Sequence, residues 1–355
     1  MKIIISKSVL ENILIHIQPF LEKKDTSQIT SHALFEARND GLIIKATDFE
    51  IGLNIHTNQV QVQEIGNVTA SGKKLLDIVR ILKDEDIILE VLQDNLHISQ
   101  SHSKFKLPTF QSNEFPSFPS FQADSNISIN SQTLIGSLKK ITSATDTNNP
   151  KFELNGALID IQSDHINFVA TDTRRLAIVD VQNSNGHELS IIIPKKAIVE
   201  IQKLFFDDIE IIYDETHLII KSQQYNFFTK LINGKFPDYT RIIPKEIKNS
   251  LSLPKAEIIN AIKQITTISN DMKISFFENS ITFESLSDDN IEAKTEMDYQ
   301  TGFSEEFVLA VNSRYILDFL SQIPSSNFEI GLNEANMPFI LQNENFKTIV
   351  MPIVI

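Results

Sequence analysis

The sequence predicts an α+β fold made of three duplicated domains, each with two helices packed on antiparallel sheets. Two observations predict it. A helical pattern that starts at Ile5 recurs at Ile129 and at Leu253, so its starts are 124 residues apart in both steps. A second helical pattern and a pair of alternating segments then follow in every copy, in the same order. Because the period is as long as a domain, it indicates duplicated domains rather than a solenoid of short repeats.

The elements within each copy support this interpretation. The first helical segment has apolar residues at three- and four-residue spacing, such as Leu10, Leu14 and Ile17, which gives one apolar helix face. Ala-Thr-Asp occurs in the following strand of two copies, and Thr47 and Thr171 are again 124 residues apart. The second helix of each copy precedes two alternating segments separated by Asp-Asn, Asp-Glu or Asn-Glu, which favour hairpin turns.

The domain boundaries are predicted where Pro and Phe accumulate between the copies. Two such stretches occur, FQSNEFPSFPSF and FPDYTRIIPK. Clusters of these residues punctuate regular structure. The predicted domains are residues 1–121, 122–243 and 244–355.

Composition restricts the class of protein. Hydrophobic residues make up 41% and charged residues 22% of the 355 residues, as in a soluble globular protein. The absence of cysteine excludes disulfides, zinc–thiolate sites and thiol nucleophiles, and it favours an intracellular, cytoplasmic location. Apolar runs are too short to span a membrane, and polar residues interrupt the first twenty positions, so neither a membrane anchor nor a signal peptide is expected.

No pattern in the sequence indicates catalysis. The phosphate-binding spacing G-x-x-x-x-G-K does not occur, and the eight His residues are scattered without H-E-x-x-H. Asp48 and Asp172 could be paired catalytic carboxylates, but they recur at the repeat interval and are interpreted as a turn or cap feature. We therefore expect a non-enzymatic protein without catalytic residues, cofactor or bound metal.

Charge is divided between helices and the rest of the chain. The net charge of −14 alone argues against nucleic-acid binding. However, the six helical segments contain 15 Lys and Arg against 6 Asp and Glu, while the remainder contains 17 against 40. These segments are 5–24, 73–83, 129–142, 194–204, 254–270 and 311–321.

The basic residues of these helices lie beside apolar stripes. Lys73, Asp77 and Arg80 are one turn apart on one predicted face of the second helix. The hypothesis is a helical surface that faces phosphates; a solvated helix face is the alternative. The candidate residues are Lys73, Arg80, Lys83, Lys139, Lys140, Lys195, Lys196, Lys203 and Lys263.

Five features, in order over the three repeats, resemble one family along the whole chain. They are VATDTRRLA (169–177), FPDY (236–239), the helix start with Asn312 and Tyr315, and the Val-Met-Pro end at 350–352, together with the triplication itself. The combination is similar to the bacterial DNA sliding clamp, the beta subunit of the replicative DNA polymerase III. The resemblance implies a DNA-clamp fold in which two chains join head to tail as a homodimer ring around duplex DNA, without sequence specificity.

The resemblance also implies a dimer interface and further DNA contacts. Phe105 and Leu107 would meet Ile268 of the partner chain, although all three could be ordinary core residues. Lys23, Lys24 and Asn148 match loop positions where the family touches DNA, and exposed loop residues without a partner are the alternative.

Finally, the resemblance implies a groove for client peptides of the Gln-Leu-x-Leu-Phe kind, carried by the polymerase, the clamp loader and repair proteins. Carried over by position, the groove comprises Leu154, Thr171, Thr173, Arg174, Arg175, Leu176, Pro237, Arg241, Ile242, Met272, Asn312, Tyr315, Met337, Pro338, Ile349, Val350, Met351 and Pro352.

Some of these positions have other interpretations or depart from the family. Leu176, Ile349 and Val350 could equally be core residues, and Asn312 could cap a helix. The chain has Thr173-Arg174 where the family often has Gly-His, Val354 where an Arg is common, and a loose match at Met272. An alternative function is an acidic, non-enzymatic interaction scaffold that does not encircle DNA; a monomeric mass in solution would favour it.

Overall fold

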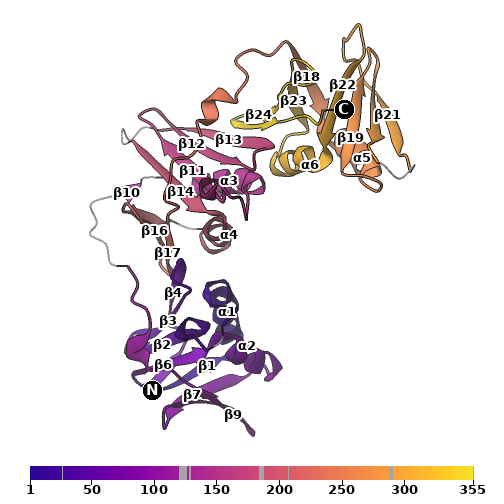
Figure 1. Ribbon diagram of the computed structural model, residues 1–355. Helices are drawn as coiled ribbons and strands as arrows, with labels where there is room; N and C mark the ends of the chain where they lie inside the picture. Colours follow the sequence, from indigo (N-terminus) through magenta and orange to yellow (C-terminus); the bar gives the residue numbers. More distant parts are fainter. Residues whose placement is uncertain are drawn as a thin grey trace. The chain divides into compact units, whose positions relative to one another are not determined.

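The computed structural model describes residues 1–25, 27–119, 126–127, 129–183, 188–206, 208–287 and 291–354 (Figure 1). The chain divides into two compact units. The first contains Met1–Gln132 and Lys203–Leu231, and the second contains Thr133–Gln202 and Ile232–Ile355. This division passes through the predicted central domain, whose strands are shared between the two units. The predicted boundary between 121 and 122 lies outside the described residues.

The first unit contains two antiparallel sheets. The order of the five-stranded sheet is β5 (Gln61–Glu64), β1 (Lys2–Ser6), β7 (Asp86–Leu92), β8 (Asn95–Gln100) and β9 (Ser103–Pro108). The order of the eight-stranded sheet is β10 (Asn126–Ile127), β15 (Glu210–Tyr213), β16 (His217–Lys221), β17 (Tyr225–Lys230), β4 (Ile51–Thr57), β3 (Gly41–Thr47), β2 (His32–Arg38) and β6 (Gly66–Ser71). Helices α1 (Lys7–Ile17) and α2 (Gly72–Ile81) pack on each other.

The second unit repeats this plan with an eight-stranded and a four-stranded sheet. The larger sheet has the order β14 (Leu189–Pro194), β11 (Gly156–Ile161), β12 (His165–Thr171), β13 (Arg175–Gln182), β25 (Phe346–Val350), β24 (Phe339–Asn343), β23 (Asn327–Leu332) and β18 (Asn249–Pro254). The smaller has the order β21 (Lys294–Asp298), β20 (Ser280–Ser285), β19 (Asp271–Phe276) and β22 (Phe307–Asn312). Helices α5 (Lys255–Ile265) and α6 (Ser313–Gln322) belong to this unit, and α3 (Ser131–Ile141) and α4 (Lys195–Leu204) lie mostly in it.

The two eight-stranded sheets have the same order when read from matching ends. In each, four strands of one repeat join four strands of the preceding repeat, through β17 and β4 in the first and β25 and β13 in the second. We call these two junctions the first and second seams. Gly52 faces Phe228 across the first seam, where Leu176 faces Ile349 across the second. A Cβ on Gly52 would lie 2.1 Å from Phe228 Cε1, so the aromatic ring takes the space that a side chain would need.

The repeated Ala-Thr-Asp motif forms the same turn twice, as the sequence predicts. Asp48 Oδ1 accepts hydrogen bonds from the backbone N–H of Glu50 and Ile51, at 3.1 and 3.0 Å. Asp172 Oδ1 accepts the corresponding bonds from Arg174 and Arg175, both at 3.0 Å. Side-chain acceptors of this kind satisfy the backbone of tight turns. The two carboxylates therefore act in the turns, which agrees with their interpretation from the sequence.

The helices are shorter than the predicted segments, and in the first and third pairs a Lys in the first turn of one helix bonds to the end of the other. Helix α5 ends at Ile265 rather than at 270. Lys7 Nζ donates to the carbonyl of Leu82 at 2.6 Å, just beyond α2, and Lys255 Nζ donates to Ile323 at 2.6 Å, just beyond α6. A cation at a helix C-terminus satisfies free carbonyls and the helix dipole. No helix in the described ranges is long and apolar enough to cross a membrane.

Candidate functional site

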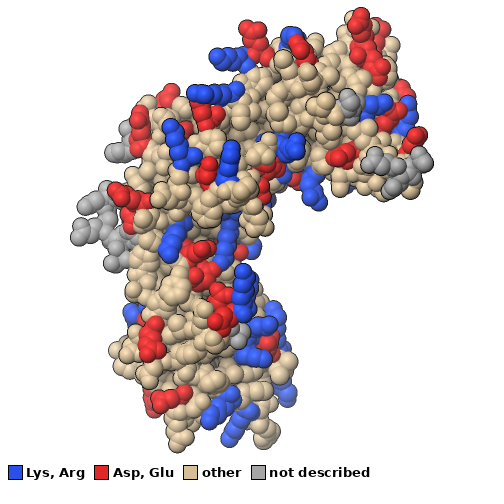
Figure 2. All heavy atoms as spheres, in the orientation of Figure 1, with Lys and Arg blue, Asp and Glu red and all other residues tan. Residues whose placement is uncertain are grey.

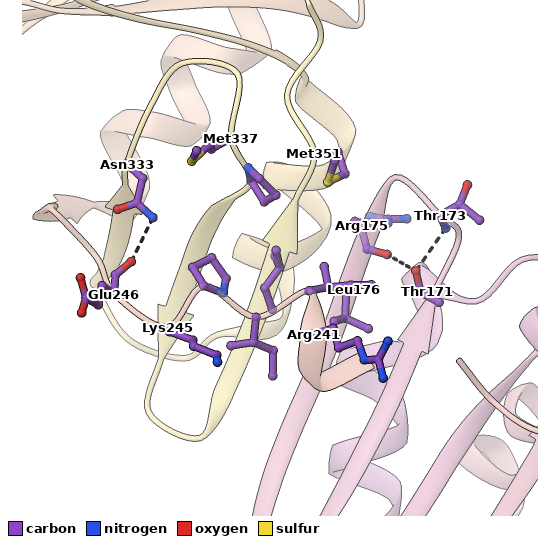
Figure 3. Close-up of a pocket in the computed structure, with 15 residues that line it drawn as sticks. Thr171, Thr173, Arg175, Leu176, Arg241, Lys245, Glu246, Asn333, Met337 and Met351 are labelled. Atoms are coloured by element: carbon purple, nitrogen blue, oxygen red, sulfur yellow. Dashed lines mark hydrogen bonds between the residues drawn. The ribbon is translucent and has the colours of Figure 1, made fainter. Parts of the chain in front are cut away.

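An apolar pocket of about 700 Å³ opens in the second unit beside the second seam (Figure 3). It lies between strands β13 and β25, the loop before β24, and the linker that follows β17. The lining residues are Thr171, Thr173, Arg175, Leu176, Arg241, Ile242, Ile243, Pro244, Lys245, Glu246, Asn333, Met337, Pro338, Ile349 and Met351. Pockets of this size hold several side chains of a peptide or a small molecule.

The floor of the pocket is part of the core of the unit. Leu176 and Ile349 face each other across the seam, and both are 1% exposed. They belong to a cluster that also contains Ile340, Phe236 and Tyr239. Two Met side chains lie at the mouth of the pocket and are accessible, since Met337 is 45% and Met351 40% exposed. Flexible thioethers over a rigid apolar floor suit a site that accepts apolar anchors from different partners.

Arg175 fixes the seam behind the pocket. Its guanidinium donates to Asp172 Oδ2 at 3.0 Å, to Asp318 Oδ2 at 2.7 Å and to the carbonyl of Ser143. It also lies 4.7 Å from the centre of the Tyr315 ring. These groups come from α6 and from the segment after α3, so one buried cation joins three elements. The guanidinium is therefore held by groups of the protein itself, although Arg175 lines the pocket as the sequence predicts.

The edge of the pocket contains an unusual backbone conformation at Thr173. Its φ of 74° lies in the left-handed region, as does that of Phe49 (φ 72°) in the equivalent turn of the first repeat. Thr171 Oγ1 stabilises the turn, because it donates to the carbonyl of Arg175 at 2.6 Å and accepts from the N–H of Thr173 at 3.1 Å. A β-branched residue in this region is strained, whereas glycine is not. Glycine would avoid this strain, so Thr173 is a costly residue at this turn.

Other predicted groove residues lie outside this pocket. Leu154, Met272 and Val350 are 2%, 0% and 0% exposed, and they are core residues. Asn312 is the N-cap of α6, since its Oδ1 accepts from the N–H of Arg314 at 3.1 Å, and its Nδ2 donates to Asp271. The remaining predicted residues, which do not line the pocket, are Arg174, Pro237, Tyr315 and Pro352.

The linker wall was largely missed by sequence reasoning. Ile243, Pro244, Lys245, Glu246 and Asn333 line the pocket, although none was predicted to. The run of apolar residues directly after FPDYTR was an available signal, because an exposed linker has little reason to be apolar unless it covers something. Nothing in the sequence singled out Asn333, whose contact depends on the fold.

Most predicted DNA-facing residues are exposed, and in Figure 2 Lys and Arg gather over helices α1 and α2. The exposed residues are Lys23, Lys24, Lys73, Arg80, Lys83, Lys139, Asn148, Lys196, Lys203 and Lys263. Two others are half-buried and engaged in the fold. Lys195 Nζ donates to the carbonyl of Thr145 at 2.8 Å, and Lys140 Nζ donates to Asn345 Oδ1 at 3.2 Å. For Lys195 and Lys140, a DNA contact stays a prediction, and the ammonium group would share its donors between the phosphate and these bonds.

The predicted interface residues lie on an edge strand of the first unit and in the loop after α5 of the second. Phe105 is half-buried and Leu107 is 9% exposed on β9, which is an edge strand of the five-stranded sheet. Ile268 follows α5 and is 38% exposed. A partner could cover Phe105 and Ile268, whereas Leu107 is already packed within its own unit. Within the described residues, no group of three or more acidic or His side chains could hold a metal ion.

Duplicated two-helix domains whose sheets join at matching seams form a DNA-clamp fold. Sequence profiles of the DNA polymerase III beta subunit agree, with its N-terminal domain matching residues 1–119, its central domain 128–238 and its C-terminal domain 240–354. The chain belongs to this family, the bacterial DNA sliding clamps. Its members are non-catalytic processivity factors, and this chain is a sliding clamp rather than an enzyme.

The relatives match over their full lengths. The beta sliding clamp of Helicobacter pylori strain J99 is 37% identical over 372 residues, covering 99% of this chain and 100% of the relative. That of Vibrio cholerae is 26% identical, with coverage of 99% and 100%. The crystal structure of the H. pylori beta clamp bound to a DNA ligase peptide has a TM-score of 0.93 and 37% identity, and the match covers 100% of both chains.

Proposed function

We propose that the pocket beside the second seam is the client site of this clamp, and that it takes short peptides with Leu and Phe anchors. The observation that carries the proposal is the recessed floor of Leu176 and Ile349 under the exposed Met337 and Met351. Leu and Phe side chains would bury their apolar surface there, and the backbone around the mouth offers hydrogen-bonding groups. The similar H. pylori clamp was crystallised with a DNA ligase peptide, which supports a peptide as the occupant.

The test is a calorimetric titration of a Gln-Leu-x-Leu-Phe peptide into the protein. Met351→Asp and Met337→Asp place a charge at the mouth without touching the buried floor, so both should abolish the micromolar binding expected of the parent. Ile65→Asp is the matched control, because Ile65 is 62% exposed and lies in the first unit, away from the residues that line the pocket. Undiminished binding by both Met variants would refute this location for the client site.

The repeated sheets indicate which edges join two chains. At each seam, the strand of one repeat that is equivalent to β9 pairs with a strand of the preceding repeat: β17 with β4, and β25 with β13. The two unpaired equivalents are β9, at the edge of the five-stranded sheet, and β21, at the edge of the four-stranded sheet. Pairing β9 of one chain with β21 of its partner would complete a third seam and remove both open edges. Since each chain has one edge of each kind, two chains close a head-to-tail ring.

The side chains on these edges are complementary. Lys104 and Lys106 are exposed on β9, and Glu296 and Asp298 are exposed on β21. On each strand these charges alternate with less exposed residues, as in any strand with one packed face. Opposite charges on paired strands stabilise the pairing and fix its partner. Phe105 would then lie on the same side of the new sheet as Ile268 of the partner, next to the helices.

The ring holds DNA by topology rather than by tight contact. Exposed Lys and Arg on the helices make few, solvent-screened contacts with phosphates, which carry no sequence information and exchange easily. Escape then requires one of the two ring interfaces to open. A polymerase bound at the client pocket is held near the primer end at high effective concentration. Replacing Lys73, Arg80 and Lys196 with Glu should impair loading and retention on circular DNA while peptide binding is unchanged.

As a DNA-replication protein of bacteria, the clamp would act in the cytoplasm, where the chromosome lies. We also propose the domain boundaries 1–121, 122–243 and 244–355, which place one helix pair in each domain. The profile matches to residues 1–119, 128–238 and 240–354 lie within or close to these limits.

A further inference from the structure

One wall of the client pocket is a stretch of linker, Ile242–Glu246, which we call the strap. All five of its residues line the pocket, and none belongs to a strand or helix. The opposite wall and the floor are built from strands β13 and β25, whose backbone is fixed by ladder hydrogen bonds. The position of the strap therefore depends on the contacts at its two ends and on Ile243, which packs against the core cluster of the pocket floor.

The first end is fixed by Tyr239, three residues before the strap. Tyr239 is 8% exposed, and its hydroxyl donates to Asp160 Oδ2 at 2.8 Å and accepts from Asn167 Nδ2 at 3.1 Å. Burial, together with the bond to the Asp160 carboxylate, raises the pKa of the Tyr239 hydroxyl, so it stays protonated and continues to donate. Asp160 lies on β11 and Asn167 on β12, so the hydroxyl attaches the linker to the eight-stranded sheet of the second unit.

At the second end, just before β18 pairs with β23, the side chain of Asn333 holds the linker, and Asn333 itself follows β23. Its Nδ2 donates to the carbonyl of Glu246 at 3.0 Å (Figure 3). Its Oδ1 accepts from the N–H of Lys248 at 2.9 Å. The side-chain amide of Asn333 thus bonds to the backbone of Glu246 and Lys248, as the backbone of a neighbouring strand would. Lys248 Nζ adds an exposed ion pair with Glu334 at 3.0 Å, which contributes little by itself.

We propose that Asn333 and Tyr239 are positioning residues of the client pocket, which act by holding the strap at the distance that the peptide requires. The proposal rests on the proposed function of the pocket. Neither residue needs to contact the peptide for this role. When an anchor is lost, the strap occupies other positions, and the apparent affinity falls by the fraction of molecules whose pocket is formed. The floor is unaffected, because Leu176 and Ile349 are held by the sheet.

The two anchors can be removed with small changes. Asn333→Ala deletes both hydrogen bonds, Asn333→Asp keeps the acceptor for Lys248 and loses the donor to Glu246, and Tyr239→Phe keeps the buried ring without its hydroxyl. Asn336→Ala is the matched control, since Asn336 is exposed on the same loop and does not line the pocket. We expect each anchor variant to bind the Gln-Leu-x-Leu-Phe peptide about tenfold more weakly, with the melting temperature and the dimer mass unchanged.

Hydrogen exchange of the free protein provides a second, peptide-independent measurement. The backbone amides of residues 242–248 should exchange faster in the anchor variants than in the parent, while those of β13 and β25 should not change. Parental affinity together with parental exchange in Asn333→Ala and Tyr239→Phe would overturn the proposal. If the parent itself binds no peptide, the proposed function fails, and the exchange measurement alone decides whether the anchors hold the strap. If Asn333→Ala unfolds, Asn333→Asp and Tyr239→Phe decide it.

Discussion

Replacement of Arg175 by Met should destabilise the second seam strongly. Met keeps most of the apolar volume of the side chain but removes the charge that Asp172 and Asp318 share. Breaking a buried ion pair by removing one partner costs about 3–5 kcal/mol, because the other charge is left without compensation. We expect the lower value, about 3 kcal/mol, since the Asp318 side chain is 32% exposed and Asp172 keeps two backbone hydrogen bonds.

The assay is native-state hydrogen exchange at the paired amides of β13 and β25, because a chain of several domains has no single unfolding free energy. A loss of about 3 kcal/mol corresponds to opening that is about a hundredfold more frequent. Arg174→Met is the control, since Arg174 is the exposed neighbour of Arg175, and it should change the exchange by less than about threefold. An Arg175→Met protein whose seam amides exchange within about fivefold of the parent would show that the cation is not what holds the seam.

Three further predictions concern other parts of the chain. Thr173→Gly should raise the thermal stability by about 1 kcal/mol, because it relieves the left-handed backbone at φ 74°; a lower melting temperature would contradict the strain. Burial lowers the pKa of His32 to about 4 from 6.5, so the unfolded chain binds the proton more tightly, and stability is lost as the pH falls from about 6.5 to about 4. The loss should be about 3 kcal/mol and should disappear in His32→Phe, as measured by melting temperature against pH. Ile268→Asp should convert the dimer to a monomer in light scattering, whereas Ile81→Asp, at a site 74% exposed, should not; a dimeric Ile268→Asp protein would refute the interface.

The architecture could be predicted from the sequence because the same pattern of helices and strands occurs three times. A spacing of 124 residues between equivalent Thr residues is independent of any one propensity, and the predicted turn role of Asp48 and Asp172 is confirmed by their bonds to backbone N–H groups. Helix lengths were overestimated, since amphipathic patterns continue into the loops beyond Ile17 and Ile265. Element ends depend on capping contacts, which a pattern of apolar residues does not record.

The site was predicted only in part, for a different physical reason. Residues that the fold brings together along a seam, such as Leu176 and Ile349, could be carried over from the resemblance. The sequence did not reveal that Arg175 donates hydrogen bonds to two carboxylates, or that Lys195 donates one to a backbone carbonyl. Asn333 is a loop residue whose value depends on a segment 85 positions away, at Lys248. Contacts of this kind appear only when the chain is folded.

The measurement that tests the clamp most directly is retention on circular and linearised DNA of the same sequence. The protein is loaded onto a nicked circle, free protein is removed, and half of the sample is cut once with a restriction enzyme. A topological ring stays on the intact circle and slides off the cut molecule within the same interval, at a salt concentration that suppresses phosphate contacts. Equal retention on both, or on neither when loading is catalysed by the cognate loader, would contradict an encircling ring and favour a scaffold that does not surround DNA.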